Sequence, residues 1–158
     1  MKHLPKHLRP RYRYLAVGLE TWPDADVDRR RFQRAVWRAA RSLLGDVGSA
    51  ELDLSVLEVE HADGAGEAIV RTRRDEVDRA RAVLACVSTV GDAAVGCHVR
   101  GVSGTVRACK ETYKGGRPEQ ASRRQVVFAN AERRAVARGE RVDVGVDGEF
   151  AGATDLDL

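Results

Sequence analysis

The most informative stretch for the fold is Gly101-Val102-Ser103-Gly104-Thr105-Val106-Arg107-Ala108-Cys109-Lys110. It predicts that a strand is followed directly by a short basic helix. Just before it, Val95, Cys97 and Val99 alternate with polar or small residues. That period of two is typical of a half-buried strand. The sequence therefore predicts a strand over 95–102 and a helix over 105–113.

The Ser-Gly-Thr corner has the features of a phosphate site. Ser103 or Thr105 can cap the helix with its hydroxyl oxygen, and Gly104 leaves the first backbone amides open to an anion. Arg107 and Lys110 add positive charge near that end. Taken alone, these residues are explained more simply by an ordinary strand-to-helix corner whose cap satisfies only its own amides.

The same motif resembles the signature of the archaeal ribonuclease P protein component 2 family, and other resemblances follow in the right order. Residues 11–15 (Arg-Tyr-Arg-Tyr-Leu) are similar to the family's opening basic-aromatic strand. Residues 66–71 (Gly-Glu-Ala-Ile-Val-Arg) are similar to its central strand. The leader 2–10 resembles that of members from salt-loving archaea. Together the resemblance covers residues 1 to 114.

This resemblance implies a non-catalytic subunit of an endoribonuclease that removes the 5′ leader from precursor tRNA. In the family, the catalytic RNA holds Mg²⁺ and hydrolyses the phosphodiester, so no cofactor or metal is expected on this chain. The implied partners are ribonuclease P RNA, precursor tRNA and ribonuclease P protein component 3, which has a barrel fold. The resemblance also implies that the pair of proteins can dimerise into a heterotetramer.

The order of the predicted elements indicates an α+β fold. Apolar positions recur with a helical period in two segments and with a period of two in four others. The resulting order, strand, helix, strand, strand, helix, strand, is the ferredoxin-like (split βαβ) pattern with an antiparallel sheet, here followed by an additional C-terminal helix. The expected segments are strand 12–20, helix 27–44, strands 52–61 and 68–73, a helix with its apolar stripe over 77–87, strand 95–102 and helix 105–113.

Charge divides the chain into further segments. Residues 1–14 carry five basic side chains and no acid, whereas residues 140–158 carry one Arg and six acids. We therefore expect a basic arm over 1–11 and a folded core over 12–114. A linker with a basic helix follows over 115–138, and an acidic, disordered tail over 139–158.

The expected RNA contacts are mainly of the phosphate type. The third strand has no aromatic residue, so the stacking platform of an RNA-recognition motif is absent. Arg11 and Arg13 lie beside the acid-free leader, whereas Tyr14 can equally be a partly buried strand aromatic. The residues expected to contact RNA are Arg11, Arg13, Tyr14, Arg71, Arg73, Ser103, Gly104, Thr105, Arg107 and Lys110.

Composition is compatible with an RNA partner in a reducing compartment. Of the 27 basic side chains, 23 are Arg, which binds phosphate bidentately, although a GC-rich genome would give the same bias. Cys86, Cys97 and Cys109 are set among apolar residues, so we expect buried free thiols. The N-terminus lacks an apolar signal core, and no run is long enough to span a membrane. The sequence thus predicts a cytoplasmic protein.

Catalytic chemistry has little support in the sequence. The four histidines have no nucleophile or metal motif beside them. Asp53, Glu58 and Glu60 are better explained as exposed acids on one strand than as metal ligands. Two other classes remain open beside the ribonuclease P subunit: a ferredoxin-like small-molecule sensor, and a protein-interaction module that does not bind RNA.

Overall fold

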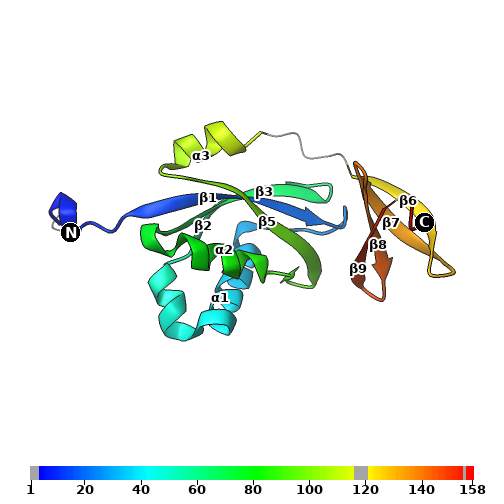
Figure 1. Cartoon of the computed structure of the whole chain (residues 1–158), viewed down its shortest axis with the longest axis horizontal. Helices are drawn as coiled ribbons and strands as arrows, with labels where there is room; N and C mark the ends of the chain where they lie inside the picture. Colours follow the sequence, from blue (N-terminus) through cyan, green and yellow to red (C-terminus); the bar gives the residue numbers. More distant parts are fainter. Residues whose placement is uncertain (1–3, 116–120, 155) are drawn as a thin grey trace.

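The computed structural model describes residues 4–115, 121–154 and 156–158. Two antiparallel sheets organise these residues: a five-stranded sheet with its helices, and a four-stranded sheet near the C-terminus (Figure 1). A short 3-10 helix (Lys6–Leu8) precedes the first strand and has no buried residue. The first sheet and its helices comprise β1 (Tyr12–Thr21), α1 (Arg29–Leu52), β2 (Ser55–Ala62), β3 (Ala65–Arg73), 3-10 helix η2 (Arg74–Glu76), α2 (Val77–Ala85), β4 (Thr89–Val90), β5 (Ala93–Ser103) and α3 (Val106–Tyr113).

The strand order confirms the predicted ferredoxin-like fold. The first sheet has the order β2-β3-β1-β5-β4, with antiparallel pairing throughout. The two-residue strand β4 only extends the edge beside β5, so the remaining strands have the split βαβ order. Between β2 and β3 the chain turns on Asp63 and Gly64, both with positive φ, as the twist of a two-residue hairpin requires.

The main core lies between this sheet and helices α1 and α2, which cover the same face in Figure 1. Leu15, Val17 and Leu19 point to that face from β1, as their alternation predicts. Phe32 and Val36 meet them from α1 and are fully buried. This cluster is large enough to account for the fold of the first sheet.

Helix α1 departs from the predicted 27–44 segment at its C-terminal end. Gly45 has φ 72°, a left-handed value that glycine adopts without a steric penalty. The backbone is interrupted there as the sequence indicates, but the helix resumes and continues to Leu52. The chain leaves it through Asp53, which is also left-handed.

Helix α3 covers part of the opposite face of the sheet (Figure 1). Its Cys109 is buried against Ala16 of β1 and Ile69 of β3. A side chain at Gly101 would overlap the ring of Tyr113, so this glycine lets α3 lie close to β5. The additional C-terminal helix predicted for the core is thus confirmed.

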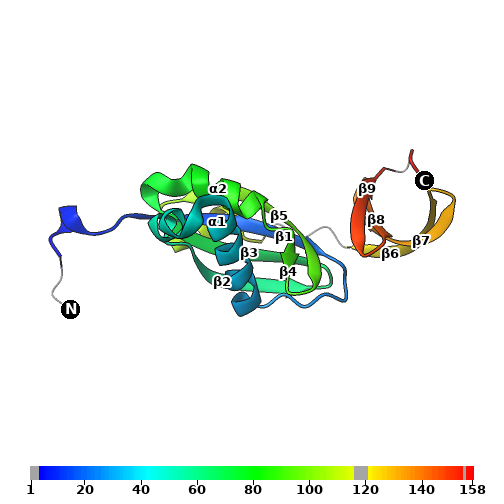
Figure 2. The ribbon, with the colours of Figure 1, turned by 90° about the horizontal axis from the view of Figure 1, so that it is seen from below.

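The segment after the core is the largest correction to the sequence predictions. The helix expected over 121–138 and the disordered tail expected over 139–158 are both wrong, because these residues form a four-stranded antiparallel meander. Figure 2 shows that this sheet is strongly curved. Its strands are β6 (Ser122–Phe128), β7 (Ala131–Arg138), β8 (Arg141–Val146) and β9 (Glu149–Ala153).

The turns explain why this region is a sheet. Ala129 and Asn130 both have positive φ and connect β6 to β7, which breaks the expected helix. Asp147 and Gly148 repeat the Asp-Gly turn of the first hairpin between β8 and β9. The inner face then buries a small cluster that includes Val142 and Val144. The predicted linker runs on into residues 116–120, which lie outside the described residues, as do residues 1–3 of the arm.

The cysteines follow the prediction only in part. All three are free thiols. Cys109 is buried and Cys97 is half-buried, and burial raises the pKa of the Cys97 thiol to about 12. Cys86 is exposed, because it caps the end of α2 instead of packing beneath it, so the expectation that all three are buried is wrong.

Candidate nucleic-acid interface

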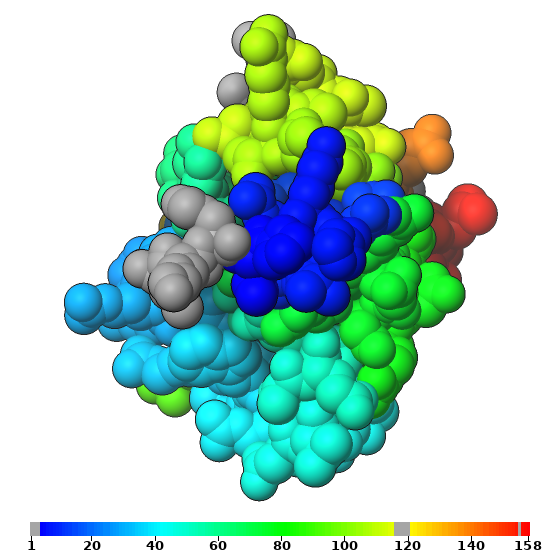
Figure 3. Space-filling view, turned by 90° about the vertical axis from the view of Figure 1, so that its left-hand side faces the viewer, coloured from blue at the N-terminus to red at the C-terminus, as the bar shows by residue number. Residues whose placement is uncertain are grey.

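Basic and aromatic side chains gather where β1 begins, a region we call the basic edge. It comprises Arg11 to Tyr14, the β3 end from Arg71 to Arg74, and the corner Ser103–Thr105. Tyr12 pairs with Arg73, and Tyr14 lies between Arg71 and Ser103 in the register. Figure 3 views the molecule from this side, with the basic N-terminal segment between α3 and α1. The sheet thus brings together residues that are up to about ninety positions apart in sequence.

The centre of the basic edge is an Arg-Tyr-Arg stack. The guanidinium carbon of Arg71 lies 4.3 Å from the ring centroid of Tyr12, and that of Arg73 lies 5.5 Å from it. Asp53 accepts a hydrogen bond of 3.0 Å from the Tyr12 hydroxyl and lies 3.4 Å from Arg73 Nε. Arg71 Nη2 donates to Ser55 Oγ over 3.2 Å. Both guanidinium groups are therefore fixed in place, and Asp53 offsets part of their charge.

The corner after β5 lies beside the start of β1. Arg13 Nη1 donates to the Tyr12 carbonyl over 3.2 Å, and it is 4.0 Å from where a Cβ on Gly104 would be. The Thr105 hydroxyl caps α3 by accepting a 3.1 Å bond from the Ala108 amide. Of the two caps considered from the sequence, Thr105 is the one used. The Arg13 guanidinium thus lies close to the capping corner.

Two of the predicted basic contacts lie away from this edge. The side chain of Arg107 is 88% exposed and forms an ion pair with Glu111, one helical turn further along α3. Lys110 and Lys114 turn toward β2, where both pair with Glu58; Lys114 also contacts Glu60 over 2.6 Å. The Lys110 hydrogen bond lowers the pKa of the Glu58 carboxyl, and the bond to Glu60 raises the pKa of Lys114. These lysines hold α3 to the sheet.

The structure gives Tyr14 and Tyr12 different surroundings. Tyr14 packs with the α3 cluster, and its carbonyl accepts a weak 3.8 Å bond from the Cys109 thiol. Its alternative reading as a partly buried strand aromatic therefore describes it better. Tyr12, which was not among the expected contacts, carries the stack with Arg71 and Arg73. The period-two pattern places Tyr12 on the same sheet face as Tyr14. Only the pairing register of β1 with β3 shows that Tyr12 lies opposite Arg73.

The described residues contain no group of three or more His, Cys, Asp or Glu side chains that could hold a metal ion. His61 is instead 2.9 Å from the Thr21 hydroxyl, and burial lowers the pKa of its imidazole. The space enclosed beneath α3, between Ile69 and Tyr113, is only about 10 Å³, enough for one water molecule.

None of the described helices is both long and apolar enough to cross a bilayer. The geometry therefore defines a class: a ferredoxin-like α+β protein with a fixed basic-aromatic edge and no metal cluster among its described residues. Such an edge suits phosphate and base contacts.

Comparison with known proteins identifies the family. The model of the Rpp14/Pop5 family matches residues 13–114. "Ribonuclease P protein component 2" of Natronomonas pharaonis is 61% identical over 100% of this chain and 98% of that protein. The protein of the same name from Haloarcula marismortui is 60% identical over 100% of this chain and 99% of that protein. The chain belongs to the Rpp14/Pop5 family.

Among solved structures, a chain from a cryo-EM structure of yeast ribonuclease MRP aligns with a TM-score of 0.48. The two chains are 14% identical, and the alignment covers 63% of this chain and 79% of that one. The fold assignment above depends on the strand order alone.

Proposed function

We propose that this chain is a protein subunit of ribonuclease P, which removes the 5′ leader from precursor tRNA. One observation carries this proposal: identity of 61% along the whole chain with a ribonuclease P protein component 2. The family match over 13–114 agrees with it. The subunit assists an endonuclease whose chemistry belongs to its RNA.

The basic edge gives this role a physical basis. Packing of a large RNA is opposed by phosphate repulsion, and fixed guanidinium groups offset that repulsion by displacing condensed counterions. Arg11 and Arg13 supply exposed or half-exposed charge there, beside the Arg71–Tyr12–Arg73 stack. By binding the folded RNA more tightly than its looser forms, the subunit raises the population that is competent for catalysis.

The assignments of metal and protein partner belong to the same proposal. Mg²⁺ is held by the RNA, and this chain binds no cofactor. Component 3 docks on the exposed apolar side of α1, where Trp37, Leu43 and Val47 are 43%, 47% and 74% exposed. The Trp37 indole is held at that surface by a 2.9 Å bond to the Leu54 carbonyl. The complex acts in the cytoplasm, and two such pairs form a heterotetramer.

Cleavage of precursor tRNA by the cognate RNA at limiting Mg²⁺ tests the proposal. The rate with component 3 alone is compared with the rate with component 3 plus this chain. A large gain that needs both proteins is the expected result. The control shows that the RNA and component 3 are active when a relative of this chain is added. If that control is active and this chain gives no gain in rate, the assignment to ribonuclease P is rejected.

A double variant then tests the basic edge. The double variant Arg11→Ala, Arg13→Ala should lower the rate gain. Because two phosphate contacts are lost, the slope of the logarithm of RNA affinity against the logarithm of salt concentration should become shallower by about 1.4–1.8. Arg30→Ala with Arg81→Ala removes the same charge from exposed positions elsewhere and is the matched control. Equal behaviour of the two double variants would exclude the basic edge as the RNA contact.

A further inference from the structure

A second basic surface lies where the C-terminal sheet meets the end of β1. A groove of about 360 Å³ runs there between the turn after β1 and strands β6 and β7. Its basic wall comes from residues beyond the family match, which ends at residue 114. The lining residues that carry charge, hydrogen-bonding groups or an aromatic ring are Trp22, Asp24, Arg123, Arg124, Gln125 and Arg134.

The strand register puts two of these arginines side by side. Gln125 pairs with Arg134, and Arg123 pairs with Val136, so Arg123 and Arg134 are diagonal neighbours on one face of the sheet. The same face carries Arg138 further along β7, because alternate residues of a strand share a face. The arginine wall of the groove thus continues directly into the contact with the core.

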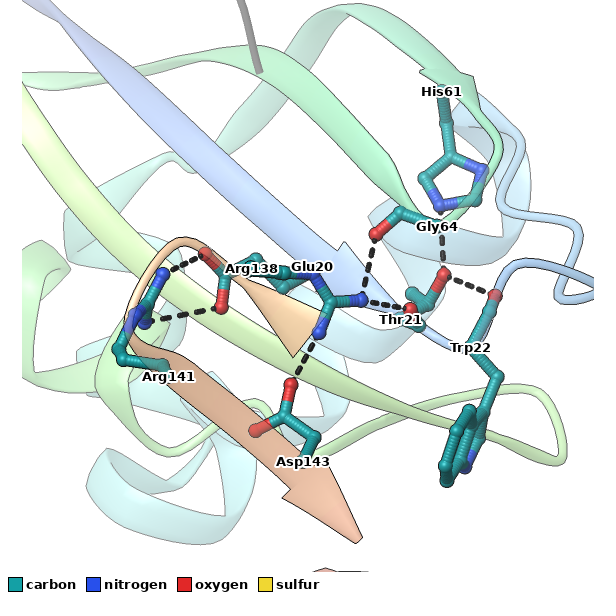
Figure 4. Close-up of polar contacts among 8 residues, drawn as sticks. All are labelled: Glu20, Thr21, Trp22, His61, Gly64, Arg138, Arg141 and Asp143. Atoms are coloured by element: carbon teal, nitrogen blue, oxygen red, sulfur yellow. Dashed lines mark hydrogen bonds and ion pairs between the residues drawn. The ribbon is translucent and has the colours of Figure 1, made fainter. Parts of the chain in front are cut away.

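That contact is a buried clamp, which Figure 4 shows in detail. Arg138 is only 3% exposed, and its Nη2 donates to the carbonyls of Thr21 and, over 3.2 Å, Gly64. Its Nη1 pairs with Asp143. One guanidinium group therefore joins the C-terminal sheet to the end of β1 and to the β2–β3 turn.

Two further contacts hold the C-terminal sheet against the core beside the groove. Arg141 binds the Glu20 carboxylate through both terminal nitrogens, at 2.7 and 3.4 Å (Figure 4). The rings of Trp22 and Phe150 pack with centroids 4.9 Å apart and planes tilted by 56°. The groove is consequently preorganised, which reduces the entropy lost when a ligand binds.

The charge of the groove selects an anionic occupant. Arg123 and Arg134 are exposed and make no ion pair with any other described residue. The lining carboxylate Asp24 is outnumbered by the exposed guanidinium groups of Arg123 and Arg134. Guanidinium groups bind phosphate as a planar fork, and an aromatic wall beside them suits a nucleobase.

We propose that this groove is a second RNA-binding surface, which holds a single-stranded segment with its phosphates on Arg123 and Arg134 and a base against Trp22. The inference goes beyond the ribonuclease P role, because the two arginines that would bind the phosphates lie outside the family match. If the RNA is that of ribonuclease P, a step that rests on the proposed function, the groove would hold a strand distant from the basic edge.

Direct binding to the full-length chain tests this proposal. Fluorescence anisotropy with a short labelled oligouridylate compares the wild type with the double variant Arg123→Ala, Arg134→Ala. We expect roughly tenfold weaker binding at moderate salt, and a log–log salt slope shallower by about 1.4, for two phosphate contacts to a single strand. Both side chains are exposed, so the melting temperature should not change. The pair Arg123→Lys, Arg134→Lys should keep most of the salt slope.

The control is again Arg30→Ala with Arg81→Ala, which removes the same charge elsewhere. Equal affinity of the groove and control variants would overturn the proposal, as would equally strong competition by an oligoglutamate, which would indicate an acidic protein segment instead. The assay uses neither component 3 nor tRNA cleavage. Failure of the groove and failure of the ribonuclease P role are therefore separate results.

Discussion

The two sheets of this molecule differ in how each is stabilised. The first sheet buries a cluster containing Phe32, Leu15 and Leu19 between itself and two helices. The C-terminal sheet spans only residues 122–153, and its inner cluster consists of small side chains, with Ala135, Val142 and Val144 at its centre. A unit of under about 40 residues rarely folds without additional support. The C-terminal sheet obtains that support from its contacts with the core, which are the Arg138 clamp, the Arg141–Glu20 ion pair and the Trp22–Phe150 ring contact.

The division between the two sheets also follows the end of the family-model match, although the relatives from Natronomonas pharaonis and Haloarcula marismortui match the whole chain. The family match covers 13–114 and so contains the first sheet, the basic edge and α3. The C-terminal sheet adds a charged groove to that framework without changing its core. A second sheet is thus attached to the end of β1 by one buried guanidinium group, one exposed ion pair and one ring contact.

The largest effect is expected in the main core. Phe32→Ala should lower the free energy of unfolding by about 3–5 kcal/mol, because a fully buried ring is replaced by a cavity. Val144→Ala, which removes two buried methyl groups from the other sheet, should cost about 2 kcal/mol. Urea titration followed by circular dichroism measures both. Equal losses would contradict the expectation that the ring buried in the main core contributes more than the methyl groups buried in the C-terminal sheet.

Breaking the clamp should release one sheet and leave the other. Arg138→Met removes the bonds to Thr21 and Gly64 and leaves Asp143 without its partner, at a cost of about 3 kcal/mol. Amide hydrogen exchange should then become fast in β6–β9 and stay slow in β1 and β3. Arg141→Gln, which breaks a more exposed ion pair, is the control and should cost under about 1 kcal/mol. Protected amides in β6–β9 of the Met variant would show that the clamp is dispensable.

A smaller effect is expected at the corner between β5 and α3. Thr105→Ala removes the acceptor of the Ala108 amide and should cost about 1 kcal/mol. Thermal melting measures the loss, and amide exchange should locate it in the first turn of α3. Ser103→Ala changes a neighbouring hydroxyl that does not cap the helix and should be nearly neutral. A larger loss at Ser103 than at Thr105 would contradict the assignment of the cap.

The smallest effect is a dependence of stability on pH at the junction. Burial disfavours the charged imidazole of His61 and lowers its pKa below the ordinary 6.5. As the pH falls through that value, the unfolded chain takes up the proton first, so stability is lost toward acid. His61→Gln should flatten this dependence between pH 7 and 5, whereas His7→Gln in the exposed arm should not. A rise in wild-type stability over that range would contradict the direction of the shift.

Local patterns were sufficient for most of the first sheet. The alternation along 12–20, the helical period after residue 27 and the Asp63-Gly64 turn all correspond to observed elements. The C-terminal sheet was missed because its apolar positions Val127, Ala131 and Ala135 are spaced by four and mimic a helical stripe. The Asn130 and Asp147-Gly148 turns carried the opposite signal. The preference of a segment for the strand conformation depends on its cross-strand neighbours. Whether residues 122–153 form strands is therefore set by the pairing partners more than by the segment's own residues.

The candidate sites also combine features that local sequence predicts with contacts that depend on the tertiary structure. Local sequence was enough to predict the strand–helix order of residues 12–113, the capping corner at Ser103–Thr105 and the basic character of the first strand. Only the tertiary structure decided that Tyr12 stacks on Arg71 and Arg73, that Lys110 pairs with Glu58, and that Arg138 is buried at a junction. The physical reason is that these contacts join residues distant in sequence, and a one-residue change of register would send every side chain of a strand to the other face.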